Sequence, residues 1–193
     1  MQILQKQIKK YLDEGYLKLS ILNSSDINFL QKQVKKKLNS LINKNKLKIK
    51  LSNLSKYHEV IQQDETHNVL MNPDTRYINL EKKIELKILK KTQSILKKVW
   101  KHNKIKCTWI GELKNKKQLK YHATGFRIAR PISKNKTKKI DVADVHIDMN
   151  AGGIINNEKN FLVTLWIPLI GFNKKYTLNI SPRSHKLNHK NSV

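Results

Sequence analysis

Apolar residues recur at intervals of three and four in three stretches of the first hundred residues. This spacing places them on one face of a helix, so the sequence predicts helices over residues 2–13, 24–42 and 79–102. Gly15 follows the first stretch, as a glycine often follows a helix, and Ser24, Ser25 and Asp26 provide a polar cap for the second. The sequence therefore predicts a mainly helical part over residues 1–104.

After residue 104 the pattern changes to short segments rich in β-branched and aromatic residues. A run of strands after a layer of helices is typical of an α+β domain. We expect one domain over residues 1–193, in which the strands of residues 105–193 form a double-stranded jelly-roll barrel flanked by helices. The predicted strands cover residues 106–113, 119–131, 144–150, 161–169 and 176–180, with a Lys-rich connection at 134–139 and a further short strand at 17–21.

A histidine and an aspartate stand two residues apart in the segment of residues 144–150. On a strand, His146 and Asp148 would project from the same face. A second histidine, His185, lies 39 residues further along, in a turn that begins with Ser181 and Pro182. Two imidazoles and one carboxylate are the ligand set of non-haem Fe(II) oxygenases. We therefore predict a metal site made of His146, Asp148 and His185.

These three residues occur in a fixed order with two further motifs, Trp166-Ile167-Pro168-Leu169 and Pro182-Arg183-Ser184-His185-Lys186. In this order the chain resembles the phytanoyl-CoA dioxygenase-like branch of the Fe(II)/2-oxoglutarate-dependent oxygenases. The resemblance covers residues 119–186, with a weaker similarity at 11–19. It implies a jelly-roll enzyme that uses Fe(II), 2-oxoglutarate and dioxygen to hydroxylate a small-molecule substrate. The identity of that substrate is not predicted.

The resemblance also implies residues that bind the co-substrate. Trp166 corresponds to an aromatic residue that lines the co-substrate pocket, although a tryptophan of the hydrophobic core would fit the same pattern. Family members bind the distal carboxylate with a basic residue about ten positions after the distal histidine, whereas Val193 is only eight residues after His185. Either the polypeptide is cut short and lacks the last barrel strand with its basic residue, or another cation replaces that residue.

Arg127 and Arg130 are the candidates for the replacement cation. They are three residues apart, so on a regular strand at most one of them points inward. Either could instead bind a carboxylate or phosphate of the substrate, or form a structural ion pair.

Charge and composition add a second interpretation. The formal net charge is +26 and the pI is about 10.1, values typical of nucleic-acid-binding proteins. However, only four of the 40 basic residues are arginines, and proteins that recognise phosphate usually use the bidentate guanidinium. We interpret the lysines as a compositional bias on solvated faces. A basic nucleic-acid-binding protein and an inactive or truncated oxygenase-fold protein are the alternatives.

The single cysteine, Cys107, excludes a disulfide within the chain, as expected in a reducing cytoplasm. The sequence has neither a secretory signal nor an apolar run of membrane-spanning length, so we expect a cytoplasmic protein without a membrane partner. His58 and His67 have no patterned partners and are interpreted as ordinary histidines. The sequence does not predict the oligomeric state.

Overall fold

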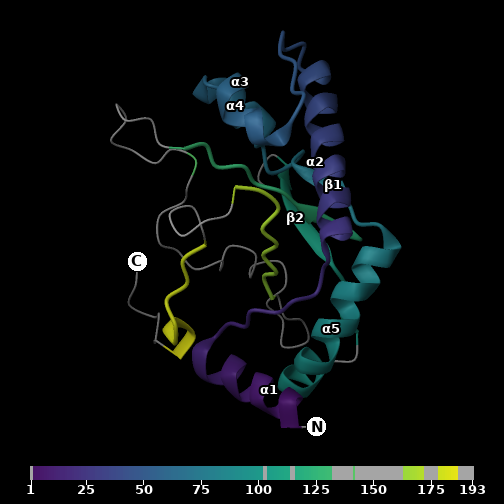
Figure 1. Cartoon of the computed structure of the whole chain (residues 1–193), viewed down its shortest axis with the longest axis vertical. Coiled ribbons are helices and arrows are strands. Elements are labelled where there is room, and N and C mark those ends of the chain that lie inside the picture. The colour runs from purple at the N-terminus through teal and green to yellow at the C-terminus, as the bar shows by residue number, and fades with distance from the viewer. Residues whose placement is uncertain are drawn as a thin grey trace.

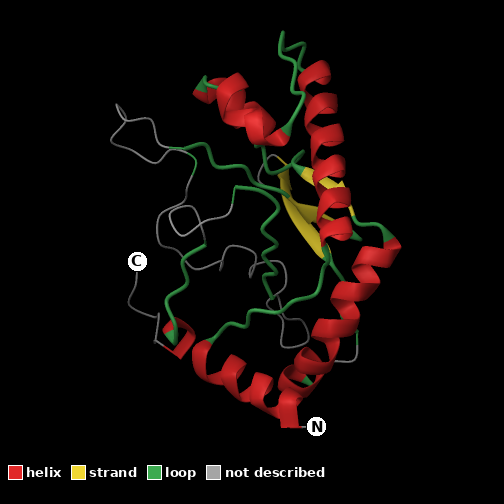
Figure 2. Ribbon diagram, viewed as in Figure 1, coloured by secondary structure: helices red, strands yellow, loops and turns green. Residues whose placement is uncertain are grey.

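The computed structural model of the chain describes residues 2–101, 104–113, 116–131, 141, 163–171 and 178–186. In the view of Figure 1, helices α2 and α5 follow one another down the right side and α1 lies across the bottom, while Figure 2 distinguishes helices from strands. The helices are α1 (Gln2–Glu14), α2 (Ser24–Lys44), α3 (Tyr57–Val60), α4 (Asp64–Leu70), α5 (Lys82–Trp100) and the 3₁₀ helices η1 (Leu54–Lys56) and η3 (Ser184–Lys186); the strands are β1 (Tyr77–Asn79), β2 (Thr108–Leu113), β3 (Lys116–Tyr121) and β4 (Ala123–Gly125).

The three long helices are confirmed within a few residues of their predicted bounds. A reciprocal cap begins α2: the Asn23 side chain accepts a hydrogen bond from the Asp26 amide at 2.9 Å, and the Asp26 carboxylate accepts one from the Asn23 amide at 3.1 Å. After α1, Gly15 adopts a φ of 82°, a left-handed conformation that glycine tolerates without strain. Local signals thus define where these helices begin and end.

The hydrophobic core lies between α2, α4, α5 and β1. The inner face of α2 supplies apolar side chains spaced by three and four residues, as the sequence predicts, and full burial of one such side chain contributes about 1.5–3 kcal/mol. The most deeply buried large side chains are Tyr57, Leu38, Ile42, Ile61, Leu70 and Ile84.

Two antiparallel sheets of two strands each occur in the described ranges. Strands β2 and β3 form a hairpin in which Thr108 pairs with Tyr121. Strand β1 pairs with β4, so that Tyr77 lies opposite Gly125. Because β1 precedes α5 and β4 follows the hairpin, this second sheet joins the helical first part of the chain to the part that begins with β2.

The jelly-roll prediction is wrong. The structure is about 50% helical, and the described residues contain only these two small sheets and no closed barrel. Residues 17–21, 126–131, 163–169 and 178–180, all expected in strands, do not belong to strands in the structure. The segments at 134–139 and 144–150 lie outside the described residues.

The segment of residues 163–169 illustrates why the strand prediction failed. Pro168 has no amide hydrogen to contribute to a sheet. The neighbouring Leu169 carbonyl accepts a hydrogen bond of 2.6 Å from the side chain of Gln31 on α2, and Ile167 and Leu169 pack against the core. Only Ile167 and Leu169 are therefore held against the core, while Val163, Leu165 and Trp166 stay exposed, although the composition of the run is that of a strand.

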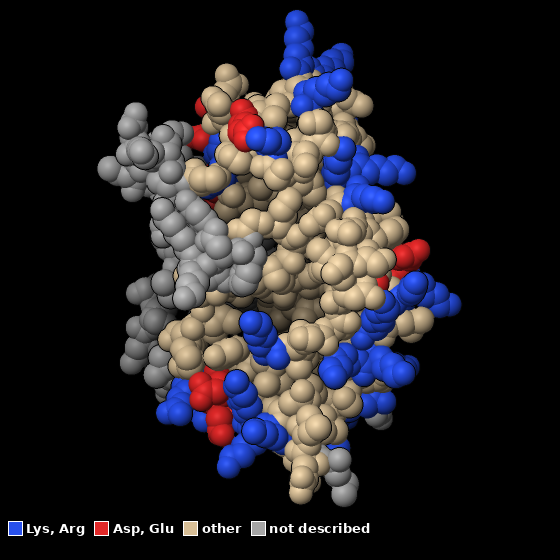
Figure 3. All heavy atoms as spheres, in the orientation of Figure 1, with Lys and Arg blue, Asp and Glu red and all other residues tan. Residues whose placement is uncertain are grey.

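Basic side chains gather along the upper, right and lower edges of the face in Figure 3, and the middle of that face carries few of them. Most lysines on the described helices are exposed or half-buried, consistent with solvated faces. Within the described ranges, no helix combines the length and apolar character needed to cross a membrane.

Candidate functional site

The predicted metal ligands fall only partly within the described residues. His146 and Asp148 lie outside them, and the backbone of His185 lies in η3. Elsewhere in the described part of the chain, no group of three or more His, Cys, Asp or Glu residues could hold a metal ion. The metal site therefore stays a prediction.

The turn that carries His185 is attached to the C-terminal end of α1, as Figure 1 shows. The amide of Arg183, which has a φ of 65°, donates a hydrogen bond of 3.0 Å to the carbonyl of Glu14. Two longer ion pairs of 3.6 Å join Arg183 to Glu14 and Lys186 to Asp13. The Arg183 hydrogen bond attaches the backbone before His185 to α1, and the Lys186 ion pair adds an exposed side-chain contact after it.

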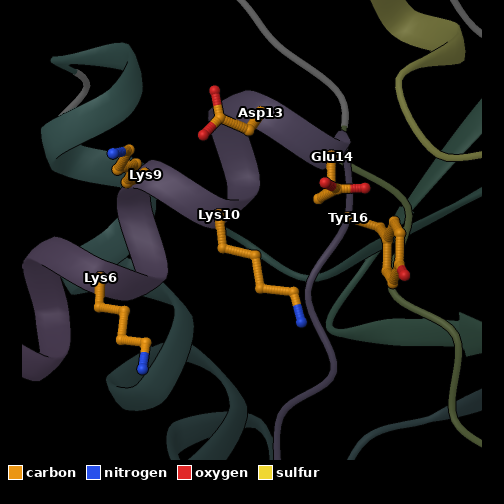
Figure 4. A pocket seen from close by; sticks show the side chains of 6 residues that line it. All are labelled: Lys6, Lys9, Lys10, Asp13, Glu14 and Tyr16. Atoms are coloured by element: carbon orange, nitrogen blue, oxygen red, sulfur yellow. The ribbon is translucent and has the colours of Figure 1, made fainter.

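A hollow of about 420 Å³ lies beside the same end of α1 (Figure 4). The side chains of Lys6 and Lys10 extend from α1, and Tyr16 lies beyond the end of the helix. The complete lining is Lys6, Lys9, Lys10, Asp13, Glu14 and Tyr16. None of the residues predicted to bind metal or co-substrate lines it. Because lysines and carboxylates both line this hollow and it is open at the surface, it does not favour a ligand of one charge over the other.

Trp166 is 46% exposed. It lies in the segment whose neighbouring residues, Ile167 and Leu169, pack against the core, but its own side chain is outside that core. The core-tryptophan alternative does not describe it, and its role in co-substrate binding stays a prediction.

Arg130 forms structural ion pairs, which the sequence analysis gave as the alternative to binding the co-substrate. Its Nε and Nη2 atoms each donate a hydrogen bond of 2.7 Å to the carboxylate of Asp141, and Nη2 donates another of 2.7 Å to Asp64. Nη1 donates to the carbonyl of Gln62 at 2.8 Å. The side chains of Arg130 and Asp141 are only 11% and 5% exposed. All three guanidinium nitrogens are therefore occupied within the protein.

His67 extends this network into the core. Its Nε2 lies 3.5 Å from Asp141 Oδ1, and its Nδ1 lies 3.1 Å from the hydroxyl of Tyr57. An ionised carboxylate only accepts hydrogen bonds, so the proton of a neutral imidazole belongs on Nε2, and Tyr57 donates to Nδ1. Burial lowers the pKa of His67 despite the opposing effect of Asp141, which favours this neutral form.

The pKa values of the other members agree with this assignment. Burial opposes ionisation of Asp141, but the hydrogen bonds from the Arg130 side chain and amide outweigh it and lower the pKa of that carboxyl. The hydrogen bond to Asp141 likewise raises the pKa of Arg130, and burial raises that of Tyr57. At neutral pH the network is an Arg130–Asp141 ion pair with a neutral His67 and Tyr57.

The position of Asp141 gives the network a structural consequence. Asp141 is five residues before His146, and it is held by Arg130, which follows β4, and by His67 on α4. Tyr57 and His67 are 1% and 4% exposed, so the network is closed to solvent and does not present a proton to a ligand. It fixes the chain where the predicted metal-binding segment begins.

Sequence reasoning missed this network. Tyr57, Asp64 and His67 are separated from Arg130 and Asp141 by more than sixty residues, so no local spacing joins them. The one available signal was the scarcity of arginine, which had already singled out Arg130.

Comparisons of the chain with protein-family models, with curated protein sequences and with solved structures return no match. The described residues form a mainly helical fold with two small sheets, and the family resemblance stays an expectation from the motifs.

Proposed function

We propose that the chain is an Fe(II)- and 2-oxoglutarate-dependent oxygenase that hydroxylates a small-molecule substrate. The observation that carries the proposal is the ordered set His146-x-Asp148, Trp166-x-Pro168-Leu169 and Ser184-His185. Its donor chemistry fits the metal, since two neutral imidazoles and one carboxylate suit Fe(II) and leave coordination positions for other ligands. Bound there, the iron would supply oxidative decarboxylation of 2-oxoglutarate coupled to hydroxylation of a C–H bond.

The anchoring of the neighbouring backbone supports the proposal. Asp141, shortly before His146, is bound by Arg130. Arg183, shortly before His185, is bound by Glu14. Ligands that must meet around one ion need supporting residues that limit their freedom, and these contacts provide such support at both ends of the ligand set.

The two candidate arginines differ in what they can offer to a co-substrate. Arg130 is committed to Asp141, Asp64 and Gln62. Arg127 is exposed, and among the described residues no acceptor binds its guanidinium. Of the two, we propose Arg127 as the cation for an anionic group, and Arg130 as a residue that positions the segment leading to His146.

The test measures iron binding and succinate formation in the full chain. Wild-type protein, His146→Ala, His185→Ala and the control His58→Ala are loaded with Fe(II) and mixed with 2-oxoglutarate under air. His58 is a suitable control because its side chain is 43% exposed and lies far from the ligand set in sequence. We expect wild type and the control to bind about one iron per chain and to form succinate, and the two ligand variants to do neither.

Equal succinate formation by wild type and His146→Ala would refute the proposal. Absence of iron binding in the wild type would refute it as well. Nucleic-acid binding that is independent of iron and weakens steeply with salt would instead favour the basic nucleic-acid-binding alternative.

A further inference from the structure

Two of the four arginines lie close together at the end of the β1–β4 sheet. The amide of Phe126 donates a hydrogen bond of 3.1 Å to the carbonyl of Arg76, and Arg127 is the next residue. Burial lowers the pKa of Arg76, and the positive charge of Arg127 lowers it further. The two charges therefore interact. Two positive charges that interact in this way repel each other, and an anion between them would relieve the repulsion.

Neither guanidinium has a hydrogen-bonded or ion-paired acceptor among the residues that the structure describes. The Nε atom of Arg76 is shielded from solvent and has no hydrogen-bond partner there. Asp74, two residues earlier, forms no ion pair with Arg76, and its own Oδ1 is likewise buried without a hydrogen-bond partner in this part of the chain. Buried donors of this kind are normally satisfied, so Arg76 has a donor for which the described residues supply no acceptor.

Trp109 holds Arg76 in a fixed orientation. The Arg76 Cζ atom lies 5.4 Å from the centre of the indole ring, a cation–π contact. The indole N–H donates a hydrogen bond of 3.1 Å to the Pro73 carbonyl. The ring also occupies the space beside Gly125, where an added Cβ atom would meet it. The Arg76 guanidinium is therefore positioned against the Trp109 ring, and its Nε–H donor has no acceptor among the described residues.

We propose that Arg76, Arg127 and Trp109 form a binding site for an oxyanion, a phosphate or carboxylate group of a small ligand. Each guanidinium offers a planar pair of N–H donors, which matches two oxygens of such a group. At Arg130, by contrast, the paired N–H donors of the guanidinium already donate to the carboxylate of Asp141. The exposed Arg127 gives the ligand access, and the indole edge provides an apolar surface for the rest of the ligand.

This site does not require the oxygenase assignment. It is consistent with an anionic substrate, or with the distal carboxylate of 2-oxoglutarate if that assignment is right. The two sources share the same recognition chemistry, and the ligands used in the test distinguish them.

The test uses the iron-free full chain, with inorganic phosphate and 2-oxoglutarate titrated separately by calorimetry at constant ionic strength. The variants are Arg127→Gln and Arg76→Gln. The matched control is Lys32→Gln, which removes one positive charge from an exposed position on α2. We expect the dissociation constant of the bound anion to rise about 10-fold or more in each arginine variant and to change little in the control.

Tight binding of phosphate would indicate a phosphorylated ligand, and tight binding of 2-oxoglutarate alone would indicate the co-substrate carboxylate. No binding of either anion by the wild type, or equal weakening in Lys32→Gln, would overturn the proposal. Neither result would bear on iron binding by His146 and His185, because the measurement contains no iron.

A second measurement tests whether Arg127 has a stabilising partner when no ligand is bound. Without ligand, Arg127→Gln removes the repulsion on Arg76, so its unfolding temperature should equal or exceed that of the wild type. A lower unfolding temperature would mean that Arg127 has a stabilising partner in the free protein, which would also overturn the proposal.

Discussion

Asp141→Asn should strongly destabilise the protein. The substitution preserves the shape of the side chain but removes the negative charge that accepts two hydrogen bonds of 2.7 Å from the Arg130 guanidinium and one of 2.7 Å from its amide. An amide nitrogen at one of these positions would face a donor. Arg130 would then keep only Asp64 as an anionic partner, and that side chain is 30% exposed.

The expected loss follows from the burial of the pair. Removing one partner of a buried ion pair costs about 3–5 kcal/mol, because the remaining charge stays desolvated. The exposed fractions, 5% for Asp141 and 11% for Arg130, place this pair in that class. The remaining contact with Asp64 favours the lower end, about 3 kcal/mol. For a chain of this size a loss of about 3 kcal/mol should lower the unfolding temperature by roughly 6–12 °C.

The effect should depend on pH with a defined sign. The pKa of Asp141 is lower in the folded protein than in the unfolded chain, so its contribution is complete above about pH 4 and is lost as the pH falls through the folded value. The difference between wild type and Asp141→Asn should therefore be largest near neutral pH and should decrease in strong acid.

Urea unfolding followed by circular dichroism measures the free energy of unfolding for both proteins. The control is Glu59→Gln, which removes an ion pair of 2.7 Å with Lys56 whose side chains are 57% and 51% exposed. That change should alter the free energy of unfolding by less than about 1 kcal/mol. A loss below about 1 kcal/mol for Asp141→Asn would refute the conclusion that this network stabilises the fold.

Three further predictions concern other parts of the molecule. As the pH falls from about 7 to 5, the free energy of unfolding of the wild type, measured in urea, should decrease. Burial lowers the pKa of His67 in the folded protein, so this histidine takes up a proton first in the unfolded chain. His67→Gln should lose less stability over the same range, and equal losses would contradict the assignment of a neutral His67. Gly125→Ala should lower the free energy of unfolding by about 1–3 kcal/mol, since the new Cβ would meet the Trp109 ring, and an unchanged value would mean that the ring moves at little cost. Burial raises the pKa of the Cys107 thiol to about 11, so alkylation by iodoacetamide at pH 8 should be roughly 100-fold slower in the native protein than in urea, and equal rates would show that the thiol is accessible.

Residues of the candidate site could be predicted only where the residue type itself was unusual in this sequence. The scarcity of arginine drew attention to Arg127 and Arg130, but the same reasoning was not applied to Arg76. His67 had no patterned neighbour, and its partners Tyr57 and Asp141 come from different parts of the chain. Nothing in local spacing indicates that a buried histidine will meet a distant carboxylate, since that contact depends on how the helices pack.

The sequence by itself determined the three long helices and the charged surface, but not the short helices α3 and α4, and the N-cap of α2 is Asn23 rather than the predicted Ser24. A helix forms its hydrogen bonds within one segment, so the apolar spacing of α2 and the Asn23–Asp26 cap are readable from neighbouring residues. Only the tertiary structure decided which extended segments pair. A strand needs a partner from elsewhere in the chain. Ile167 and Leu169 pack against the core, and the Leu169 carbonyl accepts a hydrogen bond from Gln31 of α2, whereas β1 pairs with β4 more than forty residues away.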